Sequence, residues 1–296
     1  MAYHNKEISI IIPTTRISAV QNTLESVLVQ AVNYNYEIIV VGNGVSTLKD
    51  ASPDANILFL DSAIRYTPSQ ARNIGEAKAH GEVLLFIDDD CQLEQGSLKN
   101  VLASLKDAAI GVVTGKVDGK SKRFFAKCVD LNFYLQQGSE KCYLDRFSSA
   151  VFGIRKRLFE QMGGFDEHII VREDIDFARR LIAAGYKILY SPDVVVIHDH
   201  KRDSFTKLLK YQYKSGLLSG LSVPFKHKSG WKDNIKVHFM NFYFLLVIPA
   251  AVWSTCKQVV GILKFKKNVL PFFPFLFLSN LCYQVGVLKW TATCKK

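Results

Sequence analysis

The stretch Leu84-Leu85-Phe86-Ile87-Asp88-Asp89-Asp90 decides how the rest of the chain is interpreted. Its bulky apolar residues predict a buried strand, and three consecutive carboxylates follow directly at the strand's end. Carboxylates this close repel one another unless a cation lies between them, and their oxygens suit Mg²⁺ or Mn²⁺. The alternative is a solvated acidic turn that caps the next helix. The stretch therefore predicts a divalent-metal site or a capping turn.

Charge is distributed unevenly along the chain. The 296 residues carry a net charge of +11, but residues 1–200 hold 22 Lys/Arg against 25 Asp/Glu, whereas residues 201–296 hold 16 against two. The basic part also contains the longest apolar runs, a combination typical of a membrane surface rather than of a nucleic-acid footprint. We therefore expect membrane lipid, and no nucleic acid, among the partners.

Cysteine spacing and the N-terminus bear on the compartment. The six cysteines are dispersed and show no C-x-x-C or Cys/His zinc spacing, which predicts reduced thiols in a cytosol-facing protein. The polar N-terminus, Met1 to Glu7, leads straight into a strand, so no signal peptide is expected.

Apolar strands alternate with helical segments in the first part of the chain. Such alternation is typical of a parallel sheet with crossover helices, and ligands of such sheets bind beyond the carboxyl ends of the strands. Polar residues at these ends should therefore line one crevice with nucleotide-site geometry, although no glycine-rich phosphate motif is present. Strands are predicted at 7–13, 37–41, 57–60 and 84–87, helices at 18–31 and from residue 69, and crevice residues at Thr14, Thr15, Asn43 and Asp88 to Asp90.

Three later residues are further candidates. Arg72 lies in the helix from residue 69 and suits either a phosphate or an ion pair with a carboxylate. Asp174 lies at the start of a helix over 172–185, where it acts in chemistry or only as a cap. His198 lies in a strand over 194–200 that follows a short strand over 186–190, and it is either a metal ligand or an ordinary hydrogen-bonded histidine.

Seven short motifs, in this order, resemble a family 2 glycosyltransferase of the GT-A fold over roughly residues 7–200. They are I-P-T, V-V-x-N-G, A-R-N-x-G, F-I-D-D-D, G-G-F-D-E, E-D-I-D-F-A-x-R-L-x-x-A-G-Y and H-D-H. The resemblance implies an α/β, mostly parallel and Rossmann-like sheet. It also implies inverting transfer from a nucleotide diphosphate sugar with Mn²⁺ or Mg²⁺ as cofactor.

The resemblance also assigns roles by position. It implies a metal site at Asp88, Asp90 and His198, a catalytic base at Asp174, donor contacts at Pro13, Thr14, Asn43, Arg72, Asp88 and Asp89, and an acceptor region at Gly164, Phe165, Asp166 and Glu173. Departures occur at Gly42, where members commonly carry Asp, at Val45, where they carry Ser, and at Thr15, where they carry an aromatic residue. These departures leave the identity of the nucleotide open.

The last third of the chain predicts membrane attachment. Apolar residues from Phe205 to Leu218 recur at helical spacing among lysines, which predicts a basic amphipathic helix on an anionic membrane or one packed on the catalytic domain. Val237–Cys256 and Val269–Leu288 are each about 20 residues long without Asp, Glu, Lys or Arg, enough to cross ~30 Å of hydrocarbon, and Pro271 and Pro274 predict a kink. A spanning pair and a shallow hairpin with its lysines at one interface both remain open.

The predicted organisation has three parts: a catalytic domain over 1–200, a basic amphipathic connector over 201–236, and two hydrophobic membrane helices or a hairpin over 237–296. The predicted function is a membrane-attached inverting glycosyltransferase acting on a hydroxyl of a surface polysaccharide or lipid-linked glycan. We expect the catalytic domain on the cytoplasmic face of a bacterial inner membrane. The alternatives are a nucleotidyltransferase, which has no use for the E-D base, and a catalytically inactive nucleotide-sugar binder.

Overall fold

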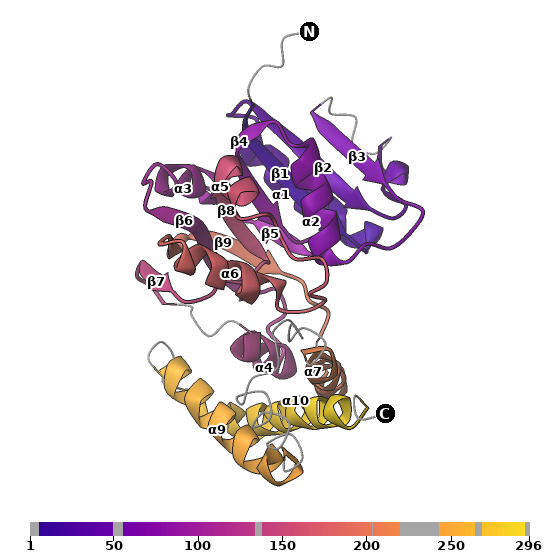
Figure 1. Cartoon of the computed structure of the whole chain (residues 1–296), viewed down its shortest axis with the longest axis vertical. Helices are drawn as coiled ribbons and strands as arrows, with labels where there is room; N and C mark the ends of the chain where they lie inside the picture. Colours follow the sequence, from indigo (N-terminus) through magenta and orange to yellow (C-terminus); the bar gives the residue numbers. More distant parts are fainter. Residues whose placement is uncertain are drawn as a thin grey trace, which may run out of the picture. The chain divides into compact units, whose positions relative to one another are not determined.

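The computed structural model describes residues 6–49, 56–133, 138–202, 204–219, 243–263 and 268–293. The chain forms two compact units, and the first is built on a mixed sheet (Figure 1). This sheet unit comprises residues 1–120, 137–167 and 173–200, and the second, helical unit comprises 121–136, 168–172 and 201–296. The predicted domain limits at 200 and 236 stay a prediction, and the connector from 220 to 236 lies outside the described residues.

The sheet contains nine strands among the described residues, in the order β3-β2-β1-β4-β8-β6-β9-β5, with β7 paired to β9. The first four strands of this order are parallel, β8 runs antiparallel between β4 and β6, and β6 is parallel to β9. The strands are β1 (Lys6–Thr14), β2 (Tyr36–Gly42), β3 (Ile57–Asp61), β4 (Gly81–Ile87), β5 (Cys91–Leu93), β6 (Ile110–Gly119), β7 (Cys142–Leu144), β8 (Val151–Arg155) and β9 (Lys187–His198).

Helices cover both faces of this sheet. One face packs against α2, α5 and α6, which lie in front of the sheet in Figure 1, through a core that includes Phe86, Phe152 and Phe177. The opposite face packs against α3. A Cβ atom on Gly153 of β8 would point toward this face and lie 2.3 Å from Val101 Cγ1 of α3. The helices of the sheet unit are α1 (Ile17–Ala31), α2 (Pro68–Lys78), α3 (Ser97–Ser104), α5 (Lys156–Gln161) and α6 (Glu173–Ala183), with a 3₁₀ turn at Val45–Leu48.

The central strands are buried on both faces, as their continuous apolar sequences predict. Ile8, Ile10, Ile11 and Ile12 of β1 and Ile38 to Val41 of β2 are fully buried. The mostly parallel α/β sheet predicted from the sequence is therefore confirmed.

The two strands predicted at 186–190 and 194–200 are wrong as separate elements, because one strand, β9, runs from Lys187 to His198. Its pairing with β6 shifts register between Gly115↔Ser191 and Lys116↔Val195, so residues 192–194 form a bulge that absorbs Pro192. A side chain at Gly115 would meet the carbonyl oxygen of Val194 at 2.1 Å, so glycine permits the bulge.

The helical unit has an apolar core of its own. It contains α4 (Phe124–Phe133), α7 (Phe205–Ser219), α9 (Tyr243–Leu263) and α10 (Phe273–Thr293), preceded by a 3₁₀ turn at Leu270–Phe272. Its apolar core joins α4, α7, α9 and α10 through residues such as Val129, Leu208, Val259 and Leu276. Pro271 and Pro274 fall in the first turns of the 3₁₀ segment and of α10, where a missing N–H is tolerated, and the predicted kink stays a prediction.

The helix α7, predicted as amphipathic, packs against α10 at two glycines. A side chain at Gly216 would lie 2.0 Å from the carbonyl oxygen of Tyr283, and one at Gly286 would lie 2.2 Å from that of Tyr213. Leu208 is fully buried in the same core. Backbone contact this close needs the absence of Cβ on both helices.

Two helices are long and apolar enough to cross a membrane, over Leu245–Leu263 and Leu270–Lys289. They are bound to each other by polar side chains, since the Asn280 amide donates to Thr255 Oγ1 and to Gln258 Oε1, both at 3.0 Å. The Gln258 amide in turn donates to the Leu131 carbonyl of α4 at 3.0 Å. The first predicted span began at Val237, and residues 237–242 lie outside the described residues.

Candidate active site

The candidate site is built at the carboxyl ends of the parallel strands. In the β1–β2 register, Thr14 pairs with Gly42. The strand β4 ends at Ile87, and Asp88 is the next residue. Pro13 pairs in register with Val41 and is half-buried. The fold thus brings the ends of β1, β2 and β4 to one edge of the sheet, as predicted.

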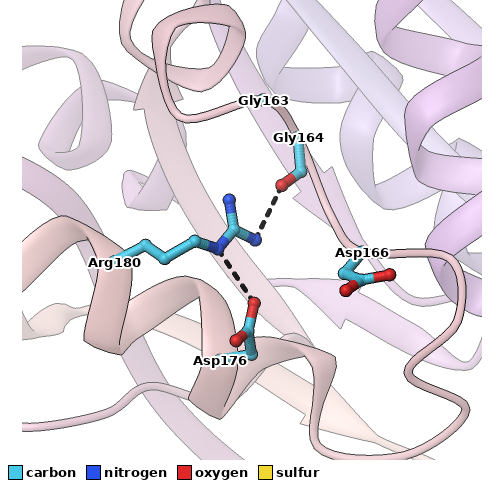
Figure 2. A pocket seen from close by; sticks show the side chains of 5 residues that line it. All are labelled: Gly163, Gly164, Asp166, Asp176 and Arg180. Carbon is cyan, nitrogen blue, oxygen red and sulfur yellow. Dashed lines mark hydrogen bonds and ion pairs between the residues drawn. The ribbon is translucent and has the colours of Figure 1, made fainter. Parts of the chain in front are cut away.

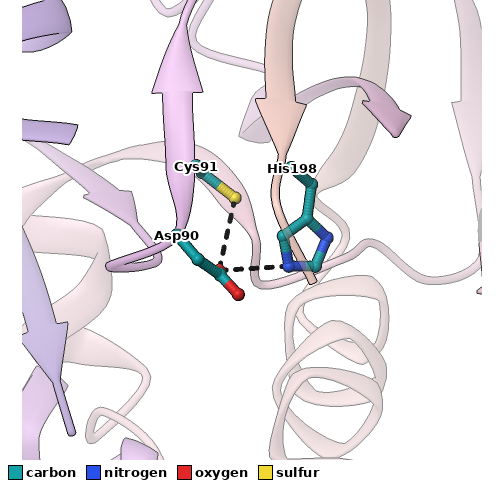
Figure 3. A group of neighbouring side chains, drawn as sticks. All are labelled: Asp90, Cys91 and His198. Atoms are coloured by element: carbon teal, nitrogen blue, oxygen red, sulfur yellow. Dashed lines mark hydrogen bonds and ion pairs between the residues drawn. The ribbon is translucent and has the colours of Figure 1, made fainter. Parts of the chain in front are cut away.

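Asp90 and His198 meet at this edge (Figure 3). Asp90 precedes β5 and His198 ends β9, and the antiparallel pairing places Cys91 opposite His198. The Nε2 atom of His198 lies 3.0 Å from Asp90 Oδ1, and Cys91 Sγ lies 3.9 Å from the same oxygen. Among the described residues, the ligand atoms of these three side chains lie within 4.8 Å of one another.

The electrostatics of this cluster favour an ionised Asp90 and a neutral Cys91. Burial alone would raise the pKa of Asp90, but the hydrogen bonds and charges of His198 and Arg16 lower it to about 2. Burial and the nearby carboxylates raise the pKa of the Cys91 thiol well above its usual range. Sequence reasoning missed Cys91 here, because its position opposite His198 depends on a three-residue strand that no periodicity marks.

Asp89 organises the loop that follows β1. Its Oδ2 accepts hydrogen bonds from the Thr14 hydroxyl at 2.8 Å, the Thr15 amide at 3.0 Å and the Arg16 amide at 3.2 Å. Its Oδ1 accepts from the Arg16 guanidinium at 2.8 Å. Both oxygens of this 5 % exposed residue are therefore engaged in holding the loop, and a donor contact for Asp89 and Thr14 stays a prediction.

Arg16 is a site residue that the sequence analysis did not name. Its guanidinium Nη2 bridges Asp89 and Asp90, while its side chain remains 42 % exposed. The signal was a single basic residue two positions after the first strand, which alone is indistinguishable from a surface arginine. The bridge depends on two carboxylates more than 70 positions away.

Arg72 is buried between two carboxylates, and its predicted contact with the donor stays a prediction. Its Nη2 lies 2.7 Å from Asp88 Oδ1 and its Nη1 lies 2.9 Å from Glu173 Oε1, while the Arg72 side chain is only 2 % exposed. The ion-pair alternative is therefore the one that the structure shows. Asp88 lies outside the Asp90, Cys91 and His198 group. Its function as a metal ligand stays a prediction.

Asp174 stands beside this ion pair, in the first turn of α6. Its Oδ1 accepts a hydrogen bond from the Ile175 amide at 2.8 Å. Burial raises the pKa of Asp174 to about 7, reinforced by repulsion from Glu173 and opposed by Arg72. A carboxylate with this pKa can take up a proton near neutral pH, which suits a general base.

The predicted acceptor residues separate into core and surface. Phe165 is 2 % exposed and packs edge-on against Phe86 and Phe152, and its contact with an acceptor stays a prediction. Asp166 is exposed, and it lines a hollow of about 330 Å³ together with Gly163, Gly164, Asp176 and Arg180 (Figure 2). Glu173 is engaged with Arg72.

Arg180 holds one wall of this hollow. Figure 2 shows its guanidinium between Asp176 and the Gly164 carbonyl, at 2.9 Å and 2.8 Å. Another nitrogen of the same guanidinium donates to the Met162 carbonyl. The A-x-R-L spacing of the helix contained this residue, but its carbonyl partners in the preceding turn could not be read from spacing.

Gly42, at the end of β2, lies where the backbone is closely packed. A side chain on Gly42 would lie 2.3 Å from the carbonyl oxygen of Thr14, so this backbone has no room for an Asp there. Asp61, at the end of β3, instead accepts hydrogen bonds from the Gly44 and Ser62 amides at 2.6 Å and 2.9 Å. Asn43 donates to the Ser62 carbonyl at 2.5 Å, and its contact with a base stays a prediction.

The donor set suits a hard or borderline divalent cation. A carboxylate oxygen is a ligand that suits Mg²⁺ and Mn²⁺, and an imidazole nitrogen suits borderline first-row ions, so Asp90, just before β5, and His198, at the end of β9, fit Mn²⁺ better than Mg²⁺. The remaining ligand, Cys91, is a protonated thiol at neutral pH and does not create a thiolate zinc site. The residues present therefore fit Mn²⁺ or Mg²⁺.

Solved structures support the fold. The chain aligns with the mannosyltransferase PcManGT from Pyrobaculum calidifontis, determined in complex with GDP-Man and Mn²⁺, at a TM-score of 0.61 and 16% identity, covering 99% of this chain and 89% of that one. The predicted GT-A fold is therefore confirmed.

Sequence comparison identifies relatives with glycan-related names. The chain is 27% identical over 281 residues to the O-antigen chain rhamnosyltransferase RfbN of Salmonella typhimurium, covering 86% of this chain and 88% of that protein. It is 25% identical over 223 residues to the glycosyltransferase AglE of Haloferax volcanii, covering 71% of each. The model of the "Glycosyltransferase like family 2" matches residues 4–213. Since this match spans more than half of the chain and agrees with the motif order, the protein belongs to glycosyltransferase family 2.

Proposed function

We propose that this glycosyltransferase is membrane-attached and inverting, and that it moves a sugar from a nucleotide diphosphate donor to a hydroxyl of a surface polysaccharide or lipid-linked glycan. The observation that carries the proposal is the placement of Asp90 at 3.0 Å from His198 at the strand ends and of Asp174 in the first turn of α6, beside the Arg72–Glu173 pair, and the pKa values of the two carboxyl groups support it. The pKa of Asp174 is about 7, whereas that of Asp90 is about 2. Environments that move the pKa values of two carboxyl groups apart in this way suit one group to proton transfer and the other to permanent negative charge.

Asp90 and His198 are the proposed metal ligands. Bound there, Mn²⁺ or Mg²⁺ supplies positive charge that stabilises the diphosphate as it leaves. Arg16 is the cation that already contacts Asp90, and it is exposed enough to move aside. Pro13, Thr14 and Asn43 are the proposed donor contacts along the strand ends.

Asp174 is the proposed catalytic base. It accepts the proton of the acceptor hydroxyl as the hydroxyl oxygen attacks the anomeric carbon, and the bond from that carbon to the diphosphate breaks. A single displacement of this kind inverts the anomeric centre. The Arg72–Glu173 pair fixes the first turn of α6 beside this carboxyl group.

The hollow beside Asp166 is the proposed acceptor surface. It is open and polar, with two carboxylates and the Gly164 backbone on its walls. Such groups suit the hydroxyls of a sugar, whose hydrogen bonds they accept.

Attachment to lipid is proposed through α9. Its N-terminal half exposes Leu245, Ile248, Val252 and Trp253 at 59, 62, 43 and 73 %. The C-terminal half of α9 also exposes Val260 and Leu263, at 59 and 43 %, so this apolar surface suits two full spans as well as shallow insertion. The lysines of the basic tail then attract anionic headgroups at the same surface.

The test is a screen of nucleotide sugars, including activated rhamnose and mannose, that measures release of the nucleotide diphosphate with a soluble sugar acceptor. The expected result is release with at least one donor, dependent on metal, and loss of release in Asp174→Asn. Product NMR of the anomeric centre then checks inversion. Absence of release with every donor, or retention at the anomeric centre, would overturn the proposal.

A further inference from the structure

Arg16 contacts two carboxylates at the edge of the sheet through a single nitrogen. Its Nη2 lies 2.8 Å from Asp89 Oδ1 and also contacts Asp90 Oδ2. All three residues belong to the sheet unit. The side chains of Asp89 and Asp90 are only 6 and 7 % exposed, whereas that of Arg16 is 42 % exposed. One half-exposed guanidinium thus balances the charge of two buried carboxylates.

The guanidinium of Arg16 has donors to spare. Within the described part of the chain, every hydrogen bond and ion pair of this side chain involves Nη2, which leaves Nε and Nη1 without a protein partner. Guanidinium N–H groups are preferred donors to phosphate oxygens. The exposed side of Arg16 therefore suits an anion that lies beside Asp90.

The two oxygens of Asp90 are divided between two partners. Oδ1 lies 3.0 Å from Nε2 of His198, and Oδ2 is contacted by Arg16. A divalent cation held by Asp90 and His198 would therefore share this carboxylate with the guanidinium. Because the two positive charges would lie a few ångströms apart, each weakens the binding of the other.

The loop around Arg16 is held by its backbone. The Arg16 amide donates to Asp89 Oδ2 at 3.2 Å and to Thr14 Oγ1 at 3.1 Å. Arg16 is also the N-cap residue of α1, but its side chain makes no capping hydrogen bond. A substitution of the side chain therefore keeps the backbone hydrogen bonds of the loop and removes only the guanidinium.

We propose that Arg16 is a second cationic group of the donor site. It competes with the divalent cation for the negative charge of Asp90, and it binds the diphosphate of the donor through Nε and Nη1. This assignment rests on the proposed metal site at Asp90 and His198. The diphosphate gains negative charge as the sugar leaves, so a guanidinium beside the metal stabilises the departing group.

The test compares Arg16→Gln with the wild-type protein, both full-length in detergent, by titration calorimetry. Titration with Mn²⁺ alone should show affinity raised by ~3- to 10-fold, because a competing and partly solvent-screened charge is removed. Titration with uridine, guanosine and thymidine diphosphates should show affinity lowered by ~10- to 10²-fold for each one that binds, in Mn²⁺ and in EDTA alike, because charge-assisted hydrogen bonds are lost. The two affinities therefore change in opposite directions.

Two further variants separate charge from geometry. Arg16→Lys keeps the charge, so its Mn²⁺ affinity should stay within about twofold of wild type, while its affinity for nucleoside diphosphate should lie between those of wild type and Arg16→Gln. Lys120→Gln is the matched control. It removes a positive charge that lies 3.6 Å from Asp199, next to His198, and should change either affinity by less than about twofold.

A fall of both affinities in Arg16→Gln would overturn the proposal, because it would mean that the side chain only holds the loop together. Unchanged binding of nucleoside diphosphate would also overturn it. A wild-type protein that binds no Mn²⁺ would refute the proposed metal site and with it the competition. The diphosphate contact would still stand or fall on the titrations in EDTA.

Discussion

Arg72 and Glu173, 101 positions apart in the chain, form a buried ion pair of 2.9 Å that connects α2 to the first turn of α6. The same guanidinium reaches Asp88 at the end of β4. One side chain thus joins the strand that delivers the acidic triplet to the helix that carries the proposed base.

Arg72→Leu should strongly destabilise the sheet unit. It leaves Glu173 without its cation in a buried setting, and breaking a buried pair in this way costs ~3–5 kcal/mol. Urea unfolding followed by circular dichroism measures the change. Lys141→Ala is the control, because its pair with Asp193 is more than half exposed and should contribute at most about 1 kcal/mol. An equal change in the free energy of unfolding for the two substitutions would show that the buried ion pair does not stabilise the fold.

Asp90→Ala should abolish turnover and weaken donor binding in Mn²⁺, yet change donor binding little in EDTA, because the carboxylate acts through the cation. His198→Ala should act in the same direction but more mildly. Titration calorimetry with the donor, with and without metal, measures both. Asp118→Ala, which removes only a partly exposed pair with Lys116, is the control. Equal donor affinity of Asp90→Ala and wild type in Mn²⁺ would count against the site.

Asp174→Asn should lower turnover by ~10²–10⁴ and leave donor affinity intact, since the amide keeps the size but accepts no proton. In the wild-type enzyme kcat should rise with pH through about 7, because the base works only when deprotonated. A steady-state pH profile measures this. An active Asp174→Asn enzyme would refute the assignment.

The same substitution should stabilise the fold at alkaline pH. The pKa of Asp174 is raised in the folded state to about 7, so between the unfolded value and 7 the folded state binds the proton more tightly and stability falls as pH rises. Asn carries no charge, so the variant should melt higher than wild type at pH 8 and similarly at pH 3. A lower melting temperature at pH 8 would mean that Asp174 acts as a structural cap.

Gly42→Ala should destabilise the chain by ~1–3 kcal/mol, because the added methyl group meets the Thr14 carbonyl and the β1–β2 pair must separate. Thermal melting measures it. Val29→Ala, at a 65 % exposed position of α1, is the control and should change stability by under about 0.5 kcal/mol. If Gly42→Ala left the melting temperature unchanged, the ends of β1 and β2 could move apart at little cost, and the position could accommodate an Asp.

The full-length protein should stay with membranes through a high-salt wash and leave only in detergent, because salt screens lysine–lipid attraction but not apolar burial. Ile248→Ser with Trp253→Ser should reduce sedimentation with anionic vesicles several-fold. Val29→Ser, an exposed apolar position of the sheet unit, should have no effect. Recovery of the wild-type protein in the salt wash would reject insertion.

The parallel half of the sheet was predictable because its strands carry their own signal. Ile8 to Ile12 and Ile38 to Val41 are continuous apolar runs, and only a strand covered on both faces accommodates such runs. The antiparallel strand β8 was not predictable, since its partner Leu85 lies far away in sequence and nothing local in Val151–Arg155 selects it. Pairing between distant strands depends on the whole sheet.

In the candidate site, too, residues marked by a local sequence signal were predictable and contacts between distant segments were not. Asp88 to Asp90 and His198 could be found because each directly follows or ends an apolar strand. The bridge from Arg16 to Asp90 and the burial of Phe165 could not, because both depend on which loops the completed fold brings together. Motif order located the candidate site, but it did not show which of its residues hold the loops.

The position of β8 between β4 and β6 has a consequence for synthesis. The strands β1 to β4 emerge first, but the free edge of β4 is covered only when Val151–Arg155 pairs with it. At about 5–20 residues per second, that edge remains open for roughly 3 to 14 seconds on the ribosome. An open apolar strand edge is a template for association with other chains. We therefore expect nascent chains that stop before residue 151 to associate with other chains or with a chaperone, and slower translation across this interval to lower the yield of folded protein.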